Sequence, residues 1–380
     1  MRVARFLICW ALFSVAAYSW AGDGDKPSRL IDPDDGWLDL SQFLDTAYGF
    51  VPLVSPITEP AVGYGATAAL VFIDRQTSTA QQRYARPNIA AIGAAATENG
   101  TRGLFAGHLG TWLDGRLRTT AAIAGADVNL EFFGLGGERR PGDTGLGYAV
   151  SARGGTFGGS YRLEQTSLWL GLRYALAKTK VSLDQPSIAL PGVTRDDRDL
   201  RLGGLTPSLT LDLRDNFFTP TDGWYADLSL PVFREWLGGD RDYGELSLSA
   251  IRYQPLARSL FLSIRAGGKS SSDGTPFYLR PYVSLRGVQA IRYQGEQTAE
   301  VEAELRWQVH RRFSVVAFAG AGVARTEALD REHRKTVTAG GAGFRYLLAR
   351  TYGLHMGLDV ADGPDKPIFY VVFGHAWLRP

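Results

Sequence analysis

Strict alternation between polar and apolar side chains runs through residues 300–308, which read EVEAELRWQ. The even-numbered positions carry glutamates, an arginine and a glutamine, and the odd-numbered positions carry valine, alanine, leucine and tryptophan. Because successive side chains of a β-strand point to opposite faces of the sheet, this stretch predicts a strand with one charged and one apolar face. Residues 205–214 and 352–360 repeat the pattern.

The composition of the charged face distinguishes two kinds of β-protein. The outer face of a soluble sandwich usually carries lysine, threonine and serine, whereas these strands carry arginine, carboxylates and many glycines on one face. A membrane barrel, with its apolar face toward lipid and its polar face toward the lumen, accounts for this pattern better. A secreted soluble β-protein is the alternative.

Overall composition agrees with a β-rich chain. Glycine supplies 45 of 380 residues, about 12% against an average near 7%, and glycine is unfavourable inside helices. The net charge of +2 argues against a nucleic-acid partner. Cys9 is the single cysteine, so disulfides, structural zinc and thiol catalysis are not expected. No cofactor or metal is predicted.

The first 21 residues have the features of a secretory signal peptide. Arg2 and Arg5 precede an apolar stretch, FLICWALFSVAA, and small residues at Ser19 and Ala21 form a cleavage site. The apolar stretch is shorter than the roughly 20 residues that a membrane-spanning helix needs. Cleavage after Ala21 and export to the outer membrane of a Gram-negative cell are therefore expected.

Turn-forming residues divide the rest of the chain into a segment at 22–61 and a barrel at 62–380. The segment does not alternate, and we expect it to lie in the periplasm with one short helix within 38–47. The barrel is expected to be antiparallel with sixteen strands, or fourteen if the pair 145–153 and 156–163 is wrong. The last strand is placed at 367–378, and a long link at 270–296 precedes the final five strands.

Two local motifs are more specific than the alternation. The first comprises Asp212, Arg214, Asp215 and Asn216, followed by Pro220 and Gly223, where short polar side chains can order a strand end and its turn. The second comprises Leu285, Arg286 and Gly287, followed by Arg292, Tyr293 and Gly295 within the long link. Glycine permits a tight loop tip, from which the guanidinium can reach inward.

Both motifs resemble those of the BamA/TamA outer-membrane assembly superfamily, also called the bacterial surface antigen family. That family carries an aspartate-x-arginine-aspartate-asparagine strand end, and a hydrophobic-arginine-glycine-aromatic tip on its sixth outer loop. The resemblance covers residues 55–380 and implies a barrel whose long outer loop folds inward. It also implies a role in the insertion or passage of proteins or lipids.

The sequence departs from the family in several places. The family's phenylalanine-x-aspartate-x-glycine strand aligns with Phe318, Gly320 and Gly322, so glycine replaces the aspartate that meets the loop arginine. We therefore expect Arg286 to be held by the inward row of Glu300, Glu302 and Glu304, because three like charges on one face require a nearby cation. POTRA repeats are not expected within residues 22–61. Gly374 and Trp377 only partly match the C-terminal strand signal of such barrels.

Enzyme motifs are not recognised in the sequence. The five histidines are scattered, and no nucleophile elbow, zinc helix or phosphate loop occurs. His355 and Asp359 share an expected inward face, which fits a polar lumen wall. The chain is predicted not to be an enzyme. Its expected partners are outer-membrane lipids and lipopolysaccharide, a client membrane protein or lipid, and the barrel assembly machinery during biogenesis. A passive or gated pore, or a barrel plugged by its loop, are the alternative functions.

Overall fold

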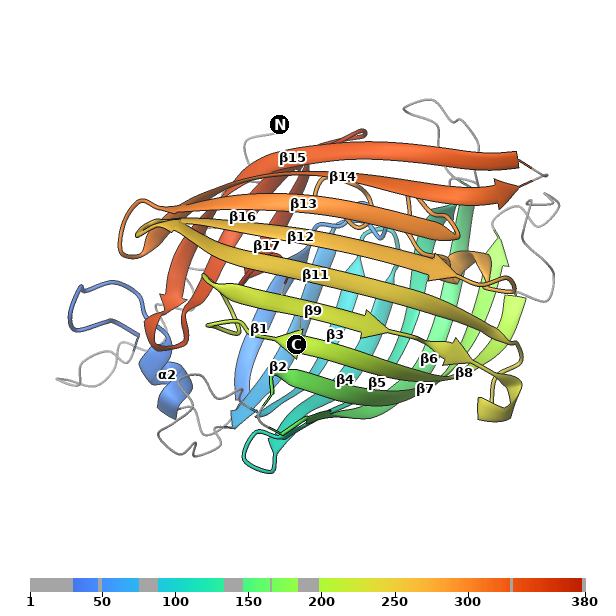
Figure 1. Cartoon of the computed structure of the whole chain (residues 1–380), viewed down its shortest axis with the longest axis horizontal. Coiled ribbons are helices and arrows are strands. Elements are labelled where there is room, and N and C mark those ends of the chain that lie inside the picture. Colours follow the sequence, from blue (N-terminus) through green and yellow to red (C-terminus); the bar gives the residue numbers. More distant parts are fainter. Residues whose placement is uncertain are drawn as a thin grey trace.

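The computed structural model describes residues 30–46, 50–74, 88–132, 146–164, 166–183, 198–328 and 331–377. The expected signal peptide lies outside the described residues. One sheet contains every named strand, and Figure 1 shows these strands arranged around a barrel. Among the described residues, no helix combines the length and apolar character needed to cross a bilayer.

The first nine strand segments follow one short helix, α2 (Ser41–Thr46). They are β1 (Phe50–Ile57), β2 (Gly65–Asp74), β3 (Asn88–Thr97), β4 (Arg102–Trp112), β5 (Leu117–Phe132), β6 (Leu146–Arg162), β7 (Leu168–Leu183), β8 (Asp199–Asp212) and β9 (Gly223–Ser229). The remaining segments are β10 (Val232–Phe233), β11 (Tyr243–Ala257), β12 (Leu260–Ser271), β13 (Gln297–Gln308), β14 (Phe313–Ala328), β15 (Arg331–Ala349), β16 (Leu354–Asp362) and β17 (Ile368–Phe373). Short 3-10 turns lie at Glu235–Leu237 (η2), Phe277–Leu279 (η3) and Arg350–Tyr352 (η4).

Seventeen strand segments occur where sixteen strands were expected. Segments β9 and β10 both pair with β8 and β11, so counting them as one interrupted strand gives sixteen. Two errors in the sequence interpretation offset each other. The single strand β6 (Leu146–Arg162) replaces the two strands expected at 145–153 and 156–163. The barrel begins earlier than residue 62, because β1 lies within the segment that was placed in the periplasm and pairs with β2 along its length.

The two faces of the strands differ as the alternation predicts. On β13, Val301 is 46% and Trp307 54% exposed, whereas Glu302 and Glu304 are each 2% exposed. In each antiparallel pair, directly opposed residues lie on the same face of the sheet. The lumen face of one strand therefore identifies the lumen face of the strands beside it. The outward face presents large apolar side chains, including Leu104, Ile123 and Leu172. This outer surface suits contact with lipid acyl chains.

Residues 30–46, called the N-terminal strap here, pack across the turns at one end of the barrel. Arg312, in the turn between β13 and β14, is 1% exposed on its side chain and lies among three strap carboxylates. Its Nε donates to Asp35 at 2.6 Å, its Nη1 to Asp39 at 2.6 Å, and its Nη2 to Asp32. Trp37 packs edge-on against Phe313, with ring centroids 5.1 Å apart. The helix expected within 38–47 is α2 of this strap.

Acid is expected to release the strap. The hydrogen bond from Arg312 holds the pKa of Asp35 below its ordinary value of 3.8, despite partial desolvation. A lowered folded-state pKa means that Asp35 stabilises the docked strap above the unfolded value, and that this contribution is lost as pH falls through the folded value. Limited digestion with an acid protease, dosed to give equal activity on an unfolded substrate at the two pH values, should therefore cleave within 30–46 at about pH 2 and spare it at about pH 5. Asp35→Asn should reduce this difference, and equal cleavage of the unsubstituted chain at both pH values would contradict the prediction.

Candidate functional site

The long link between β12 and β13 turns back into the barrel instead of extending away from it. Three apolar side chains near its tip are buried, with Val283 1%, Leu285 5% and Val288 3% exposed. They pack with Ala324 of β14 and Val337 of β15. These contacts exclude water from the loop tip and fix it against the inner wall.

Glycines on the wall provide the space that the loop tip occupies. A Cβ atom at Gly320 would lie 2.9 Å from Leu285 Cδ2, and one at Gly322 would collide with Val283 Cγ1. Gly287 at the tip has a φ of +88°, which side-chain-bearing residues rarely adopt. The glycine at position 320, where the resembling family has aspartate, therefore has a steric role, because it receives Leu285.

Arg286 lies over this wall and contacts three carboxylates. Its Nε donates to Glu302 Oε1 at 2.6 Å, and its Nη1 donates to Glu304 Oε2 at 2.6 Å and Asp359 Oδ2 at 2.9 Å. The guanidinium carbon lies 3.6 Å from the centroid of the Phe318 ring, a distance that permits cation–π attraction. These five residues are called the Arg286 anchor.

Further charged groups surround the anchor and balance it. Arg345 on β15 donates to both oxygens of Asp359, through Nη2 at 2.9 Å and also through Nη1. Arg265 on β12 approaches Glu302 and Glu300 at 3.5 Å each. Desolvating several charges is expensive unless each has a close partner of opposite sign, so the network is stable only when it is complete. The anchor thus links the loop with β12, β13, β14, β15 and β16.

The structure brings Arg286 together with two members of the expected glutamate row. It also adds a third carboxylate, Asp359, that was not expected to contact Arg286. Glu302 and Glu304 contact it, whereas Glu300 is an ion-pair partner of Arg265 instead. Asp359 was interpreted only as part of a polar lumen wall beside His355. Asp359 lies on β16, which two strands separate from β13 in the sheet, and the loop tip reaches both β13 and β16 across β14 and β15, which no local motif encodes. His355 itself contacts Thr219 through Nδ1 at 3.2 Å.

The rest of the loop motif fastens the loop to neighbouring elements. Arg292 forms an ion pair with Asp365, in the turn between β16 and β17, at 3.2 Å. Tyr293 accepts a backbone hydrogen bond from Val283 at 3.0 Å. A Cβ atom at Gly295 would lie only 2.4 Å from the backbone oxygen of Arg325, so the loop stem lies close to β14. The motif residues therefore stabilise the loop stem as well as its tip.

The strand-end motif orders the turn between β8 and β9. Arg214 donates two hydrogen bonds to the Asp212 carboxylate, from Nε to Oδ1 at 2.8 Å and from Nη2 to Oδ2 at 3.0 Å. Asp215 accepts from the Thr221 backbone at 2.8 Å, and Asn216 accepts from the backbone of Phe218 and Thr219 at 2.8 and 2.9 Å. Pro220 is fully buried, and Gly223 has a φ of +111°. The motif is a connected set of side chains that replaces missing backbone hydrogen bonds in the turn.

The C-terminal strand ends earlier than expected. Segment β17 stops at Phe373, and Gly374 has a φ of +74°, so the chain leaves the sheet where a strand to 378 was placed. Trp377 is buried and its indole nitrogen donates to Glu302 Oε2 at 3.0 Å. His375 approaches Glu304 at 3.5 Å. The Gly374 and Trp377 pair therefore turns the chain inward to the Arg286 anchor.

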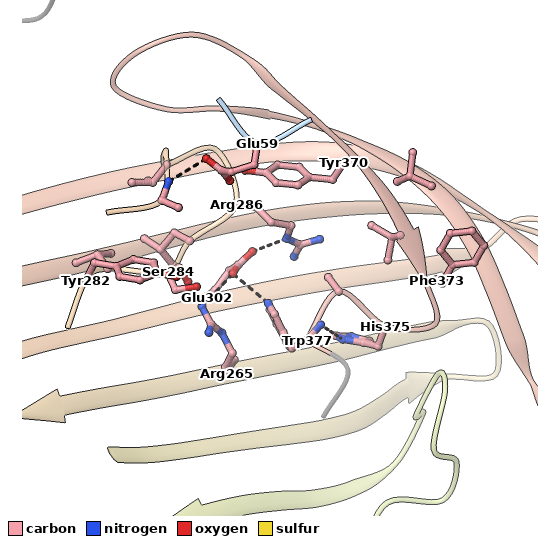
Figure 2. Close-up of a pocket in the computed structure, with 17 residues that line it drawn as sticks. Glu59, Arg265, Tyr282, Ser284, Arg286, Glu302, Tyr370, Phe373, His375 and Trp377 are labelled. Atoms are coloured by element: carbon pink, nitrogen blue, oxygen red, sulfur yellow. Dashed lines mark hydrogen bonds and ion pairs between the residues drawn. The ribbon is translucent and has the colours of Figure 1, made fainter. Parts of the chain in front are cut away.

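A cavity of about 470 Å³ lies beside the anchor, between the loop and β17 (Figure 2). Glu59, in the turn between β1 and β2, lines it and accepts a hydrogen bond from the backbone of Ala290 at 3.0 Å. Tyr370 of β17 lines it too, and its hydroxyl accepts from the backbone of Gly287 at 3.0 Å. The loop thus contacts the hairpins that contain the first and last strands of the chain.

In the described part of the chain, no set of three or more histidine, cysteine, aspartate or glutamate side chains is arranged to hold a metal ion. The carboxylates of the anchor are instead neutralised by guanidinium groups.

Comparison with known proteins places this geometry in a family. A family model described as the Omp85 superfamily domain matches residues 121–349. No curated protein matches the chain.

Three solved structures share the fold at low sequence identity. BamA from Haemophilus ducreyi lacking POTRA domains 1–3 has a TM-score of 0.55 and 12% identity, over 91% of this chain and 80% of that one. CdiB from Escherichia coli has a TM-score of 0.55 and 14% identity, over 87% and 60%. CdiB from Acinetobacter baumannii has a TM-score of 0.57 and 9% identity, over 93% and 72%. These matches confirm the expected all-β, antiparallel barrel and the resemblance drawn from the motifs.

Proposed function

The chain belongs to the Omp85 superfamily, and from that premise we propose that it assists the insertion or passage of proteins or lipids across the outer membrane. The observation that carries the proposal is the Arg286 anchor, which holds the long loop against one side of the barrel wall. The absence of catalytic activity is part of the same proposal.

The position of the loop suggests how the barrel could act on a client. Glu59 and Tyr370 connect the loop tip to the hairpins of β1 and β17. Among the described residues β1 pairs with β2 and β17 pairs with β16, and no register joins β1 to β17. Separation of the two hairpins along this seam would expose backbone donors and acceptors, which can template an incoming strand. The contacts of Glu59 and Tyr370 with the loop would resist that separation. The loop would then control how readily the barrel opens sideways.

Reconstitution tests the proposed function directly. The purified full chain in proteoliposomes should speed the folding of a urea-unfolded outer-membrane barrel, compared with empty liposomes of the same lipid. Folding of the client is followed by its heat-modifiable migration on gels, and ion conductance of the same preparation is measured in planar bilayers. Arg201→Ala, at an exposed pair with Asp240, serves as a control that should behave as the unsubstituted chain.

The outcomes separate the three functions considered. Faster client folding with low conductance supports the proposal. Steady conductance without any effect on the client would contradict it and favour a pore. The absence of both effects would also contradict the proposal, and it would favour a barrel plugged by its loop.

A further inference from the structure

A second cavity lies on the wall formed by β5 to β9, away from the Arg286 anchor. Its volume is about 270 Å³, just below the range of about 300–1,000 Å³ for small-molecule sites. Segment β7 shows which side it faces. Leu170 is 52% exposed on the lipid side, so Gly171 and Arg173 face the lumen with the opposite parity, as do most of the lining residues. Leu172 and Gly159, which are paired and have the parity of the lipid face, also border the cavity.

The strand registers arrange the lining in two rows across the wall. One row runs through Arg118, Ser160, Gly171 and Ser208 on β5 to β8. The next row, two residues further along each strand, runs through Thr120, Gly158, Arg173 and Thr206. Hydroxyl groups and guanidinium groups thus alternate with glycines over a small area.

Glycine leaves the floor of this cavity open. A Cβ at Gly171 would collide with Ser208 Oγ and would lie 2.9 Å from Ser160 Oγ. The two serine hydroxyls therefore converge over position 171, where any side chain would fill the space. No hydrogen-bond partner of either hydroxyl is found among the described residues.

The charges of the cavity have opposite signs at its two ends. Arg173 is exposed to the lumen and has no ion-pair partner within the described part of the chain. Arg118 stacks on Trp169 at 3.8 Å from the ring centroid and pairs with Asp212 at 3.5 Å. At the other end Asp227 accepts a hydrogen bond from Thr210 at 2.7 Å. A ligand should therefore place an anionic group at Arg173 and hydroxyl donors toward Asp227.

We propose that this part of the lumen wall binds a small anionic saccharide. Its phosphate or carboxylate contacts Arg173, and its ring hydroxyls contact Ser160, Ser208 and the Asp227 carboxylate. A guanidinium suits an oxyanion because its donors form a planar fork. Since the cavity faces the lumen and not the lipid, the proposed ligand is a free saccharide and not a lipid headgroup. This site is independent of the action proposed above on client chains.

Isothermal titration of the full chain in detergent tests the site, with glucose 6-phosphate, glucose and inorganic phosphate as probes. Glucose 6-phosphate should bind more tightly than either other probe. Arg173→Gln should weaken its binding about tenfold or more, because a hydrogen bond to a charged group is lost. Ser208→Ala should weaken it by a smaller factor. Arg102→Gln, at a side chain that is 77% exposed, is the matched control and should leave binding unchanged.

Several results would overturn the proposal. These are no detectable binding of glucose 6-phosphate at about 1 mM, equal binding of inorganic phosphate alone, and unchanged binding in Arg173→Gln. Heat-modifiable migration of each variant shows whether it has folded. If Arg173→Gln fails to fold, the decision rests on Ser208→Ala and on the comparison of the three probes.

Discussion

Arg286→Ala is expected to destabilise the barrel by about 3–5 kcal/mol, because it leaves buried carboxylates without their cation. Glu302 and Glu304 are each 2% exposed, so little water reaches them to replace the guanidinium. The variant should unfold at lower urea concentration, and proteases should cleave sooner within 272–296. Its conductance in planar bilayers should be larger or noisier, since the loop is no longer held.

A matched control separates this effect from the general loss of an arginine. Arg201→Ala removes a pair with Asp240 whose arginine side chain is 66% exposed, and such pairs contribute at most about 1 kcal/mol. Arg286→Lys should recover only part of the stability, because an ammonium group cannot donate to three carboxylates from a planar fork. A loss for Arg286→Ala that is no greater than that for Arg201→Ala would rule out a buried anchor.

Ile123→Arg is expected to cost about 2–4 kcal/mol, the penalty for arginine facing lipid near the middle of a membrane barrel. Ile123 is 67% exposed on the outer face of β5. The neighbouring Ala122 has the opposite parity and lies opposite Gly107 of β4 and Thr156 of β6, on the lumen face. Ala122→Arg is therefore the matched control on the same strand, and it should cost far less.

Urea titrations of both variants in lipid vesicles measure this difference. Equal destabilisation by the two substitutions would mean that lipid does not cover the outer face. That result would favour the alternative, a soluble β-protein. A larger cost for Ala122→Arg would reverse the assignment of the two faces.

The strands could largely be predicted from sequence because their signal is local. Alternation of polar and apolar residues fixes the two faces of β13, β8 and β16 without any knowledge of their neighbours. Segment β1 was missed because FVPLVSPI contains two prolines and lacks charged residues, so it carries no alternation. Segment β6 was divided in two because its glycines, including Gly154 and Gly155, resemble a turn.

Only two parts of the Arg286 anchor could be predicted from the sequence, namely the loop tip and the charged face of one strand. The Leu285–Gly287 tip and the glutamate row of β13 are each visible in sequence, and the need for charge balance connects them. Asp359 and Trp377 join the same cluster from β16 and from the end of the chain. The participation of Asp359 depends on how far the loop tip reaches across β14 and β15, and that of Trp377 depends on the turn at Gly374. Spacing along the chain does not reveal either distance.

The 270–296 loop lies inside the barrel with its tip on the glycines of β14. Formation of a disulfide between Val283→Cys and Gly322→Cys, in a Cys9→Ser background, tests this placement of the loop. A bond needs Cβ atoms about 3.5–4.5 Å apart, and the Val283 side chain already reaches the position of a Cβ at residue 322. Mild oxidation should therefore join the two cysteines, while the control pair of Val283→Cys with Gly171→Cys stays reduced. Failure of the first pair to cross-link, with rapid labelling of position 283 by a membrane-impermeant maleimide on whole cells, would show that the loop projects outward and would contradict the account.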